Sequence, residues 1–368
     1  MRAESPDGSE KHGERMNRLR DLFISPDLYP LMLDVERNVL TFVPMSRESY
    51  RNSVFLDLRT RPMGEGTYEL PLDDLLLAAT RYAPPLRRVH YILNSAYCCS
   101  TLMARYFELL PSCFVLKEPR LLAQLALMED HSRPEWKAVF DLCLRLLSRT
   151  YAPDEMVVMK PVDCCSMIGN RLLQQNSQAS ITFLMIPLRN FILSILKSGE
   201  RRDWARMRIR QVFKRAAVWP EIAGKDLEQL NVAESSACLW LVHRYLAGQL
   251  LNGPHHSRVL LVNGDDLAEA PRQPLAAILE MCRLPADEEA LDRMVSHPSV
   301  ARYSKDLSRP YDASTRSSEI VELERCWSDE ADAGMEWAAR HAWPGLDVFA
   351  TTLAESKVSQ PLASAAMG

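Results

Sequence analysis

The stretch that decides the fold reads VHYILNSAYCCST and occupies residues 89–101. Its first six residues suit a buried strand. A short loop then leads into a segment with helical periodicity, in which Leu102, Tyr106 and Leu109 share one face. A strand, a tight loop and a helix N-terminus form a common anion site, because backbone N–H groups and the helix dipole point at the ligand. The sequence therefore predicts an anion-binding turn after this strand.

The same stretch has a simpler interpretation, in which Ser100 or Thr101 only caps the helix and binds nothing. If an anion is bound, the two hydroxyls would add hydrogen bonds to it. A phosphate loop of the ATP-binding type reads GxxxxGK[ST], and this stretch has neither Gly nor Lys before Ser100. A kinase or NTPase is disfavoured, because the lysine that contacts the transferred phosphate is missing.

Outward from this stretch, short apolar runs alternate with helix-compatible segments, the pattern of a parallel sheet covered on both faces. The further strands are expected at residues 113–117, 156–160, 181–186 and 259–263. We therefore expect an α/β fold with a mostly parallel five-stranded sheet of P-loop type and helices on both faces.

Four regions are expected along the chain. Residues 1–20 form a mobile leader, and residues 21–85 form a small β-rich N-terminal module with β-like runs at 39–43 and 54–58. Residues 86–350 form the main α/β domain, with a strong helix between residues 233 and 251. Residues 351–368 are small and polar and are expected to form a flexible tail.

The composition is that of an ordinary globular protein: 368 residues, 47% hydrophobic, 44 basic and 48 acidic side chains, and a net charge of −4. This balance excludes a disordered chain and argues against a general nucleic-acid binder. No run approaches the roughly 20 apolar residues of a membrane span. The nine cysteines form no CxxC pair and the eight histidines show no metal-ligand spacing, so we expect free thiols, no metal and a cytoplasmic location.

Three further segments follow strands in order: VLKEPRLL at 115–122, VVMKP at 157–161 and FLMIPLRNFILS at 183–194. Together with the loop at 94–101, they resemble the motifs of the P-loop sulfotransferase family over roughly residues 87–310. The resemblance implies transfer of a sulfuryl group from 3′-phosphoadenosine 5′-phosphosulfate (PAPS) to a hydroxyl-bearing small molecule. The family loop often reads PRSGTTLL, so Tyr97 stands where a basic residue is common and Cys99 where Gly is common.

The resemblance also implies roles for individual residues. The 5′-phosphosulfate would lie on the loop, and the 3′-phosphate would bind Arg189 and Ser194, with Lys305 in a late segment that folds over the nucleotide. The loop residues concerned are Ala96, Tyr97, Cys98, Cys99, Ser100 and Thr101. Arg suits a phosphate as a bidentate fork. The alternatives are a surface ion pair for Arg189 and an ordinary helix serine at position 194.

Two residues are candidates for catalysis because sulfuryl transfer to an alcohol needs a base and a cation. Glu118 follows a strand at the carboxyl edge, where open α/β sheets bind ligands, and Pro119 would fix the turn that aims it. Lys160 ends another strand at the same edge. The alternatives are a surface Glu118 paired with Lys117 or Arg120, and a solvated strand-end lysine.

Basic side chains are frequent between residues 197 and 215, as expected for either a cationic rim that attracts a polyanion or a solvated helix face. His90 and His243 lie in apolar segments and are expected in the core. The leading hypothesis is a PAPS-dependent sulfotransferase. A non-catalytic nucleotide-binding protein on the same fold is the alternative, and a kinase-like phosphotransferase is a weaker one. The acceptor and the oligomeric state do not follow from the sequence.

Overall fold

The structure is a computed structural model that describes residues 19–60, 66–128, 134–216, 227–285, 287–303, 306–310, 312–343 and 346–348. Most of the expected leader, the expected tail at 351–368 and Lys305 lie outside the described residues.

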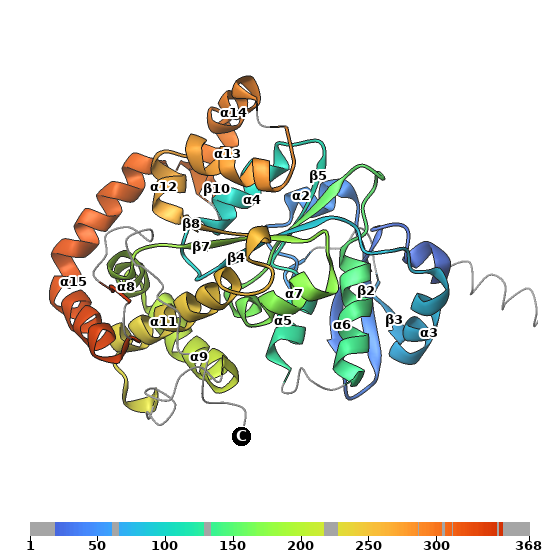
Figure 1. Ribbon diagram of the computed structural model, residues 1–368, viewed down its shortest axis with the longest axis horizontal. Coiled ribbons are helices and arrows are strands. Elements are labelled where there is room, and N and C mark those ends of the chain that lie inside the picture. The colour runs from blue at the N-terminus through green and yellow to red at the C-terminus, as the bar shows by residue number, and fades with distance from the viewer. Residues whose placement is uncertain are drawn as a thin grey trace, which may run out of the picture. The chain divides into compact units, whose positions relative to one another are not determined.

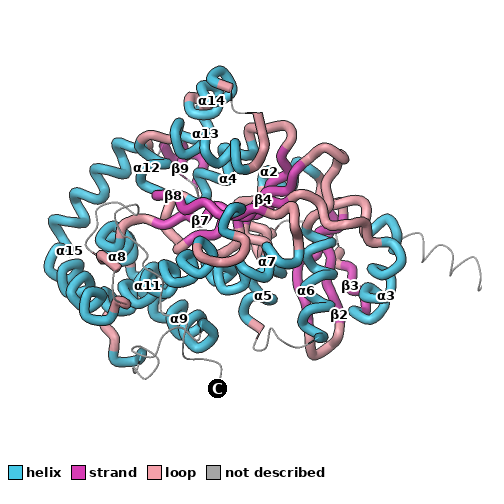
Figure 2. Tube along the Cα trace, viewed as in Figure 1, coloured by secondary structure: helices cyan, strands magenta, loops and turns pink. Residues whose placement is uncertain are grey.

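The chain forms a five-stranded parallel sheet in the order β5-β6-β4-β7-β8, as the sequence predicts. Its strands β4, β7 and β8 are labelled in Figure 2. Its strands are β4 (Val89–Asn94), β5 (Cys113–Lys117), β6 (Met156–Lys160), β7 (Ser180–Met185) and β8 (Val259–Asn263). Every residue of β4, β5 and β6 is buried, so these strands have no solvent-facing side and read as continuous apolar runs. Four of the five expected strands have the predicted bounds, and β7 begins and ends one residue earlier.

The chain forms two compact units, one of Met1–Val89 with Leu110–Pro161 and one of His90–Leu109 with Val162–Gly368. Each unit is made of two separate segments of the chain. The sequence-based prediction instead divides the chain once, between residues 85 and 86.

In the first unit, an antiparallel sheet with the order β1-β2-β3 packs with the segment 110–161. The elements here are β1 (Leu28–Asp34), β2 (Val39–Pro44), α2 (Arg47–Asn52), β3 (Tyr68–Pro71), α3 (Leu72–Tyr82), α5 (Arg120–Leu127) and α6 (Pro134–Leu147). The buried Arg149 guanidinium joins the two parts by donating to the carbonyl oxygens of Leu22, Ser25 and Leu28 at 2.6–2.8 Å. The N-terminal β-rich region is therefore part of a larger packed unit.

The β-like run expected at residues 54–58 is wrong, since this segment forms turns and bends rather than a strand. It nevertheless makes strand-like contacts. The Leu56 N–H donates to the carbonyl oxygen of Lys117 at 2.7 Å, and the Leu56 carbonyl accepts from the Arg120 N–H at 3.0 Å. Leu56 is fully buried, so its apolar side chain reflects core packing rather than strand periodicity.

In the second unit, helices cover both faces of the strands: α12 and α13 lie on one side of β7 and β8, and α8 and α11 lie on the other (Figure 1). The remaining long helices, α9 and α15, pack on α8 and α11. The bounds are α4 (Ser100–Glu108), α7 (Gly169–Gln175), α8 (Leu188–Leu196), α9 (Gly199–Ala216), α11 (Val232–Leu251), α12 (Gly264–Glu269), α13 (Arg272–Met281), α14 (Glu288–Val295), β9 (Arg302–Tyr303), β10 (Asp306–Pro310) and α15 (Ala313–His341).

The predicted helix near residues 233–251 is confirmed as α11. It begins at a capping box, in which the Asn231 side chain accepts from the Glu234 N–H and the Glu234 carboxylate accepts from the Asn231 N–H. None of the helices among the described residues is long and apolar enough to cross a membrane.

Candidate functional site

The loop between β4 and α4 contains three non-glycine residues with left-handed backbone: Ala96 (φ 66°), Tyr97 (φ 51°) and Cys99 (φ 65°). Such conformations are uncommon outside glycine and cost of order 1–3 kcal/mol each, so the surroundings must hold them. Ala96 and Tyr97 are consecutive and Cys99 follows after one residue, so the chain turns sharply between β4 and α4. The Ala96 N–H is used within this turn, because it donates to the Asn94 side-chain oxygen at 3.1 Å. The strained backbone therefore lies where the sequence predicts an anion site, and the N–H groups at the start of α4 are the donors that it leaves for an anion.

Contacts from β7 and α12 fix this loop. The Ser95 N–H and the Cys98 thiol both donate to the Leu184 carbonyl oxygen, at 3.1 and 3.3 Å. Gly264, the first residue of α12, packs directly on the loop, and a Cβ at this position would lie 2.1 Å from the Cys98 carbonyl oxygen. Only glycine fits there, because a backbone oxygen cannot yield as a flexible side chain can.

The start of α4 is not capped by a side chain. Its N-cap is Cys99, which makes no side-chain cap hydrogen bond, and Ser100 and Thr101 already lie inside the helix. The interpretation of Ser100 or Thr101 as the N-cap is therefore wrong. The buried Ser95 hydroxyl also has no hydrogen-bond partner among the described residues. An uncapped helix start beside a buried unsatisfied hydroxyl fits an anion such as a phosphosulfate.

Tyr97 turns toward helix α9. Its ring meets the Trp204 ring edge-on, with centroids 5.1 Å apart, and the Arg201 guanidinium carbon lies 4.4 Å from the Tyr97 centroid. Arg201 and Trp204 are one helical turn apart and present the same side of α9. A cation therefore stands beside the loop at the position where the loop itself lacks a basic residue.

Arg189 lies at the start of α8 and is held by two carboxylates of α15. Its Nε donates to both carboxylate oxygens of Glu324 at 3.1 Å, and its Nη1 donates to Asp332 Oδ1 at 2.5 Å. These carboxylates raise the pKa of the Arg189 guanidinium. In this arrangement Arg189 is engaged in surface ion pairs, so its donors do not fit a 3′-phosphate unless α15 releases them.

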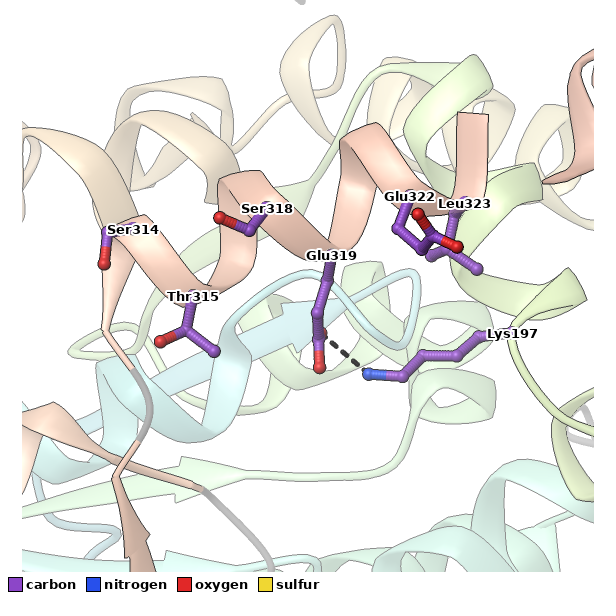
Figure 3. A pocket seen from close by; sticks show the side chains of 7 residues that line it. All are labelled: Lys197, Ser314, Thr315, Ser318, Glu319, Glu322 and Leu323. Atoms are coloured by element: carbon purple, nitrogen blue, oxygen red, sulfur yellow. Dashed lines mark ion pairs between the residues drawn. The ribbon is translucent and has the colours of Figure 1, made fainter. Parts of the chain in front are cut away.

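Ser194 is buried in α8, and its carbonyl oxygen accepts from Arg201 Nη1 at 2.7 Å. Beyond it, Lys197 points at Glu319 of α15, with the charged atoms 2.7 Å apart (Figure 3). The pair lines a groove of ≈ 570 Å³ whose other walls are residues of α15. These residues are Ser314, Thr315, Ser318, Glu322 and Leu323. Carboxylates of α15 thus neutralise cations at both ends of α8.

The expected nucleotide-covering residue Lys305 lies outside the described residues. The segment just before it is tied to α4, because Arg105 Nη1 donates to the carbonyl oxygen of Arg302 at 2.6 Å.

Both histidines singled out by the sequence are buried, as expected. His90 Nδ1 lies 2.9 Å from the Ser180 hydroxyl, and burial lowers the pKa of His90 to about 3. His243 Nδ1 lies 3.1 Å from the Ser166 hydroxyl, and its Nε2 lies 3.6 Å from the Asp163 carboxylate. Both histidine side chains are fully buried, so they belong to the core and are not accessible to a substrate.

In the first unit, Glu118 and Lys160 contact each other at the carboxyl ends of β5 and β6. The Glu118 N–H donates to the Lys160 carbonyl oxygen at 2.6 Å, and the Lys160 ammonium donates to the Glu118 carboxylate. Glu118 has left-handed backbone with φ 52° and comes directly before Pro119, and its side chain is 17% exposed. The strained turn aims the carboxylate at its neighbouring strand rather than at solvent.

The simpler interpretation of Lys160 does not hold. The neighbouring Lys117 donates to the Arg51 carbonyl oxygen at 2.9 Å. The Lys160 side chain is 6% exposed, so it is not a solvated strand-end lysine. An ammonium carries three donors, and the bond to Glu118 uses one of them.

No group of three or more His, Cys, Asp or Glu that could hold a metal ion occurs within the described parts of the chain. Sequence reasoning included Arg201 only as one of the basic residues between 197 and 215, and it missed Gly264 as a support of the loop. Both lie far from the loop in the sequence, and the excess of basic residues between 197 and 215 is the only signal that could have drawn attention to Arg201.

No protein-family model and no curated protein matches this sequence. Among solved structures, a sulfotransferase of Alicyclobacillus acidocaldarius has 12% identity and a TM-score of 0.37, covering 69% of this chain and 95% of its own. A sulfotransferase of Mycobacterium tuberculosis has 12% identity and a TM-score of 0.39, covering 69% and 81%. Retinol dehydratase, solved with androsterone and the inactive cofactor PAP, has 10% identity and a TM-score of 0.38, covering 90% and 96%. Because these TM-scores lie below 0.5, the function proposed for this chain rests on its own residues rather than on these likenesses.

Proposed function

We propose that this protein is a PAPS-dependent sulfotransferase that acts on a hydroxyl-bearing small molecule. The observation that carries the proposal is the loop at 94–101, with three left-handed non-glycine residues, an uncapped helix start and a buried hydroxyl without a partner. Strain of this kind persists where the surrounding structure enforces it, often at ligand sites. The loop would receive the 5′-phosphosulfate through its N–H groups and the hydroxyls of Ser100 and Thr101.

Glu118 is proposed as the base and Lys160 as the charge stabiliser. The bound donor would supply the electrophilic sulfur and a bisphosphate leaving group. The acceptor oxygen would form the new bond to sulfur while the sulfur–oxygen bond to the leaving phosphate breaks, and Glu118 would take the acceptor proton. The bond from Lys160 fixes the Glu118 carboxylate, and the remaining Lys160 donors would meet the negative charge on the transferred group.

A non-catalytic nucleotide-binding protein on the same fold is the second candidate, and one observation favours it. Arg189, the proposed 3′-phosphate ligand, is held by Glu324 and Asp332. A chain that has lost the need for a 3′-phosphate would tolerate such ion pairs. The two candidates differ in what they bind and in whether sulfate moves.

Thermal shift with adenosine 3′,5′-bisphosphate (PAP), with ATP and without ligand distinguishes binding, because a ligand of the folded state raises the melting temperature by mass action. Transfer of labelled sulfate from PAPS to a panel of phenols and alcohols then tests catalysis. We expect stabilisation by PAP and not by ATP, together with transfer to at least one acceptor. Stabilisation by ATP alone would favour a phosphotransferase, and PAP binding without any transfer would favour the non-catalytic protein.

A further inference from the structure

Most cations near the proposed site are already paired with carboxylates. Arg189 is bound by Glu324 and Asp332, and Lys197 is bound by Glu319. On α9, Arg208 lies 3.1 Å from the buried Asp163 carboxylate, and Arg210 pairs with Glu228. The basic run is therefore not one free cationic rim, because several of its charges are compensated within the protein.

Arg201 has no such ion pair within the described parts of the chain, and neither has Arg202. Arg201 differs from Arg202 because it contacts the loop through the Tyr97 ring, whereas Arg202 contacts the Trp327 ring. Among the described residues, no carboxylate lies within ion-pair distance of it, and the contacts of its guanidinium are the Ser194 carbonyl oxygen at 2.7 Å and the Tyr97 ring at 4.4 Å. It also lies in the first turn of α9, where the helix dipole disfavours a cation. The Ser194 carbonyl belongs to the last turn of α8, where the helix dipole favours a cation, so this bond offsets part of that cost without bringing a full negative charge.

The Tyr97 ring determines where this cation lies. The ring belongs to the loop, and it is held between Arg201 and Trp204 on the same side of α9. A guanidinium on an aromatic face keeps its N–H groups free at its edges, and only one of the five Arg201 donors is used by Ser194. Tyr97 thus holds a cation of α9 beside the N–H groups of the loop.

We propose that Arg201 is the cationic ligand of the 5′-phosphate group at the loop, in the place of a basic residue at position 97. The inference rests on the proposed function, and it assigns Arg201 to the 5′ end of the nucleotide rather than to its 3′-phosphate. Tyr97 is then a positioning residue that acts through Arg201.

The test compares two nucleotides that differ only at the 5′ end: PAP and adenosine 3′-monophosphate. Calorimetric dissociation constants are measured for the wild type, Arg201→Gln, Arg201→Lys and Tyr97→Leu. Arg293→Ala serves as the control, because Arg293 is an exposed residue of α14 whose ion pair with Glu289 is on the surface. Circular dichroism melting verifies that each variant is folded.

Loss of one charge-assisted contact corresponds to about a ten- to hundredfold change in affinity. We expect Arg201→Gln to weaken the binding of PAP by this factor and the binding of adenosine 3′-monophosphate by less than about twofold. Arg201→Lys should retain part of the PAP affinity, Tyr97→Leu should weaken PAP selectively, and Arg293→Ala should change neither.

Three results would overturn the assignment. Equal weakening of both nucleotides by Arg201→Gln would mean that Arg201 does not contact the 5′ group. Unchanged PAP affinity in a folded Arg201→Gln protein would exclude Arg201 as a ligand of the 5′-phosphate, but it would not contradict the proposed function. A wild-type protein that binds neither PAP nor adenosine 3′-monophosphate would contradict the proposed function itself, and the role of Arg201 with it.

Discussion

Replacing the carboxylates that hold Arg189 should strengthen the binding of a 3′-phosphate. The variant is Glu324→Gln with Asp332→Asn, which keeps the size and polarity of both side chains but removes their charge. If Arg189 is the 3′-phosphate ligand, the nucleotide must displace these two carboxylates before it can bind. Removing their charge removes the competition, so PAP should bind more tightly.

The expected size follows from the exposure of the three side chains. Arg189 is 31% exposed, Glu324 40% and Asp332 58%, so both pairs are largely solvated. An exposed ion pair contributes about 0–1 kcal/mol, so the two together oppose binding by at most about 2 kcal/mol. Since about 1.4 kcal/mol is a factor of ten, PAP affinity should rise by up to roughly 30-fold. The melting temperature should fall only slightly, because solvated pairs add little stability.

Calorimetry with PAP and with adenosine 5′-monophosphate provides the assay, since the second nucleotide lacks the 3′-phosphate. The matched control is Asp329→Asn with Glu330→Gln, which removes two exposed carboxylates from the same helix. Only the Glu324 and Asp332 variant should gain affinity, and only for PAP. An unchanged PAP constant, together with an Arg189→Ala protein that still prefers PAP, would refute the assignment of Arg189 to the 3′-phosphate.

Three further outcomes are expected. Glu118→Gln should lower single-turnover sulfate transfer by about 10²–10⁴ with PAP affinity nearly unchanged, and a folded variant with wild-type turnover would exclude Glu118 as the base. Gly264→Ala should destabilise the fold by about 1–3 kcal/mol in denaturant titrations and weaken PAP, because its Cβ would lie 2.1 Å from the Cys98 carbonyl oxygen; wild-type values for both would contradict this packing. Burial lowers the pKa of His90 to about 3, so the unfolded chain binds a proton that the folded chain does not, and stability should fall as the pH drops from about 6.5 toward 3. His90→Asn should remove up to about 1.4 kcal/mol per pH unit of that slope between pH 6 and 4, and an identical slope would place the pH dependence elsewhere.

The central sheet could be predicted from the sequence because its strands are buried on both faces. β4, β5 and β6 consist of buried residues, and such runs stand out against the helices between them. The N-terminal sheet was harder to predict. β1 includes Pro30, and its pairing with β2 shifts register between Pro30 and Met32, so the strand lacks a regular two-residue period.

The proximity of Glu118 and Lys160 was predictable in part, because both follow strands whose carboxyl ends lie at one edge. The parallel register that pairs Lys117 with Lys160 brings the two together, and this register depends on tertiary packing. The ion pairs of Arg189 could not be predicted, since Glu324 lies 135 residues away in the sequence. No local sequence pattern indicates that its helix, α15, packs on α8. The spacing of the motif identifies Arg189, but this spacing carries no information about which carboxylates pair with the Arg189 guanidinium.

Arg189 and Arg201, both in the second unit, differ in how readily each could bind a polyanion. Arg189 matches the expected motif but has its charge compensated by α15, so it can serve only by exchanging partners. Arg201 matches no motif, yet it lies on the loop's own tyrosine without a carboxylate among the described residues. A phosphate gains more from a cation that is already uncompensated, because no ion pair has to be broken first. We therefore expect the 5′ group to contribute more of the nucleotide affinity than the 3′-phosphate in the wild type. In the Glu324→Gln and Asp332→Asn variant, the 3′-phosphate should contribute more to the nucleotide affinity than it does in the wild type.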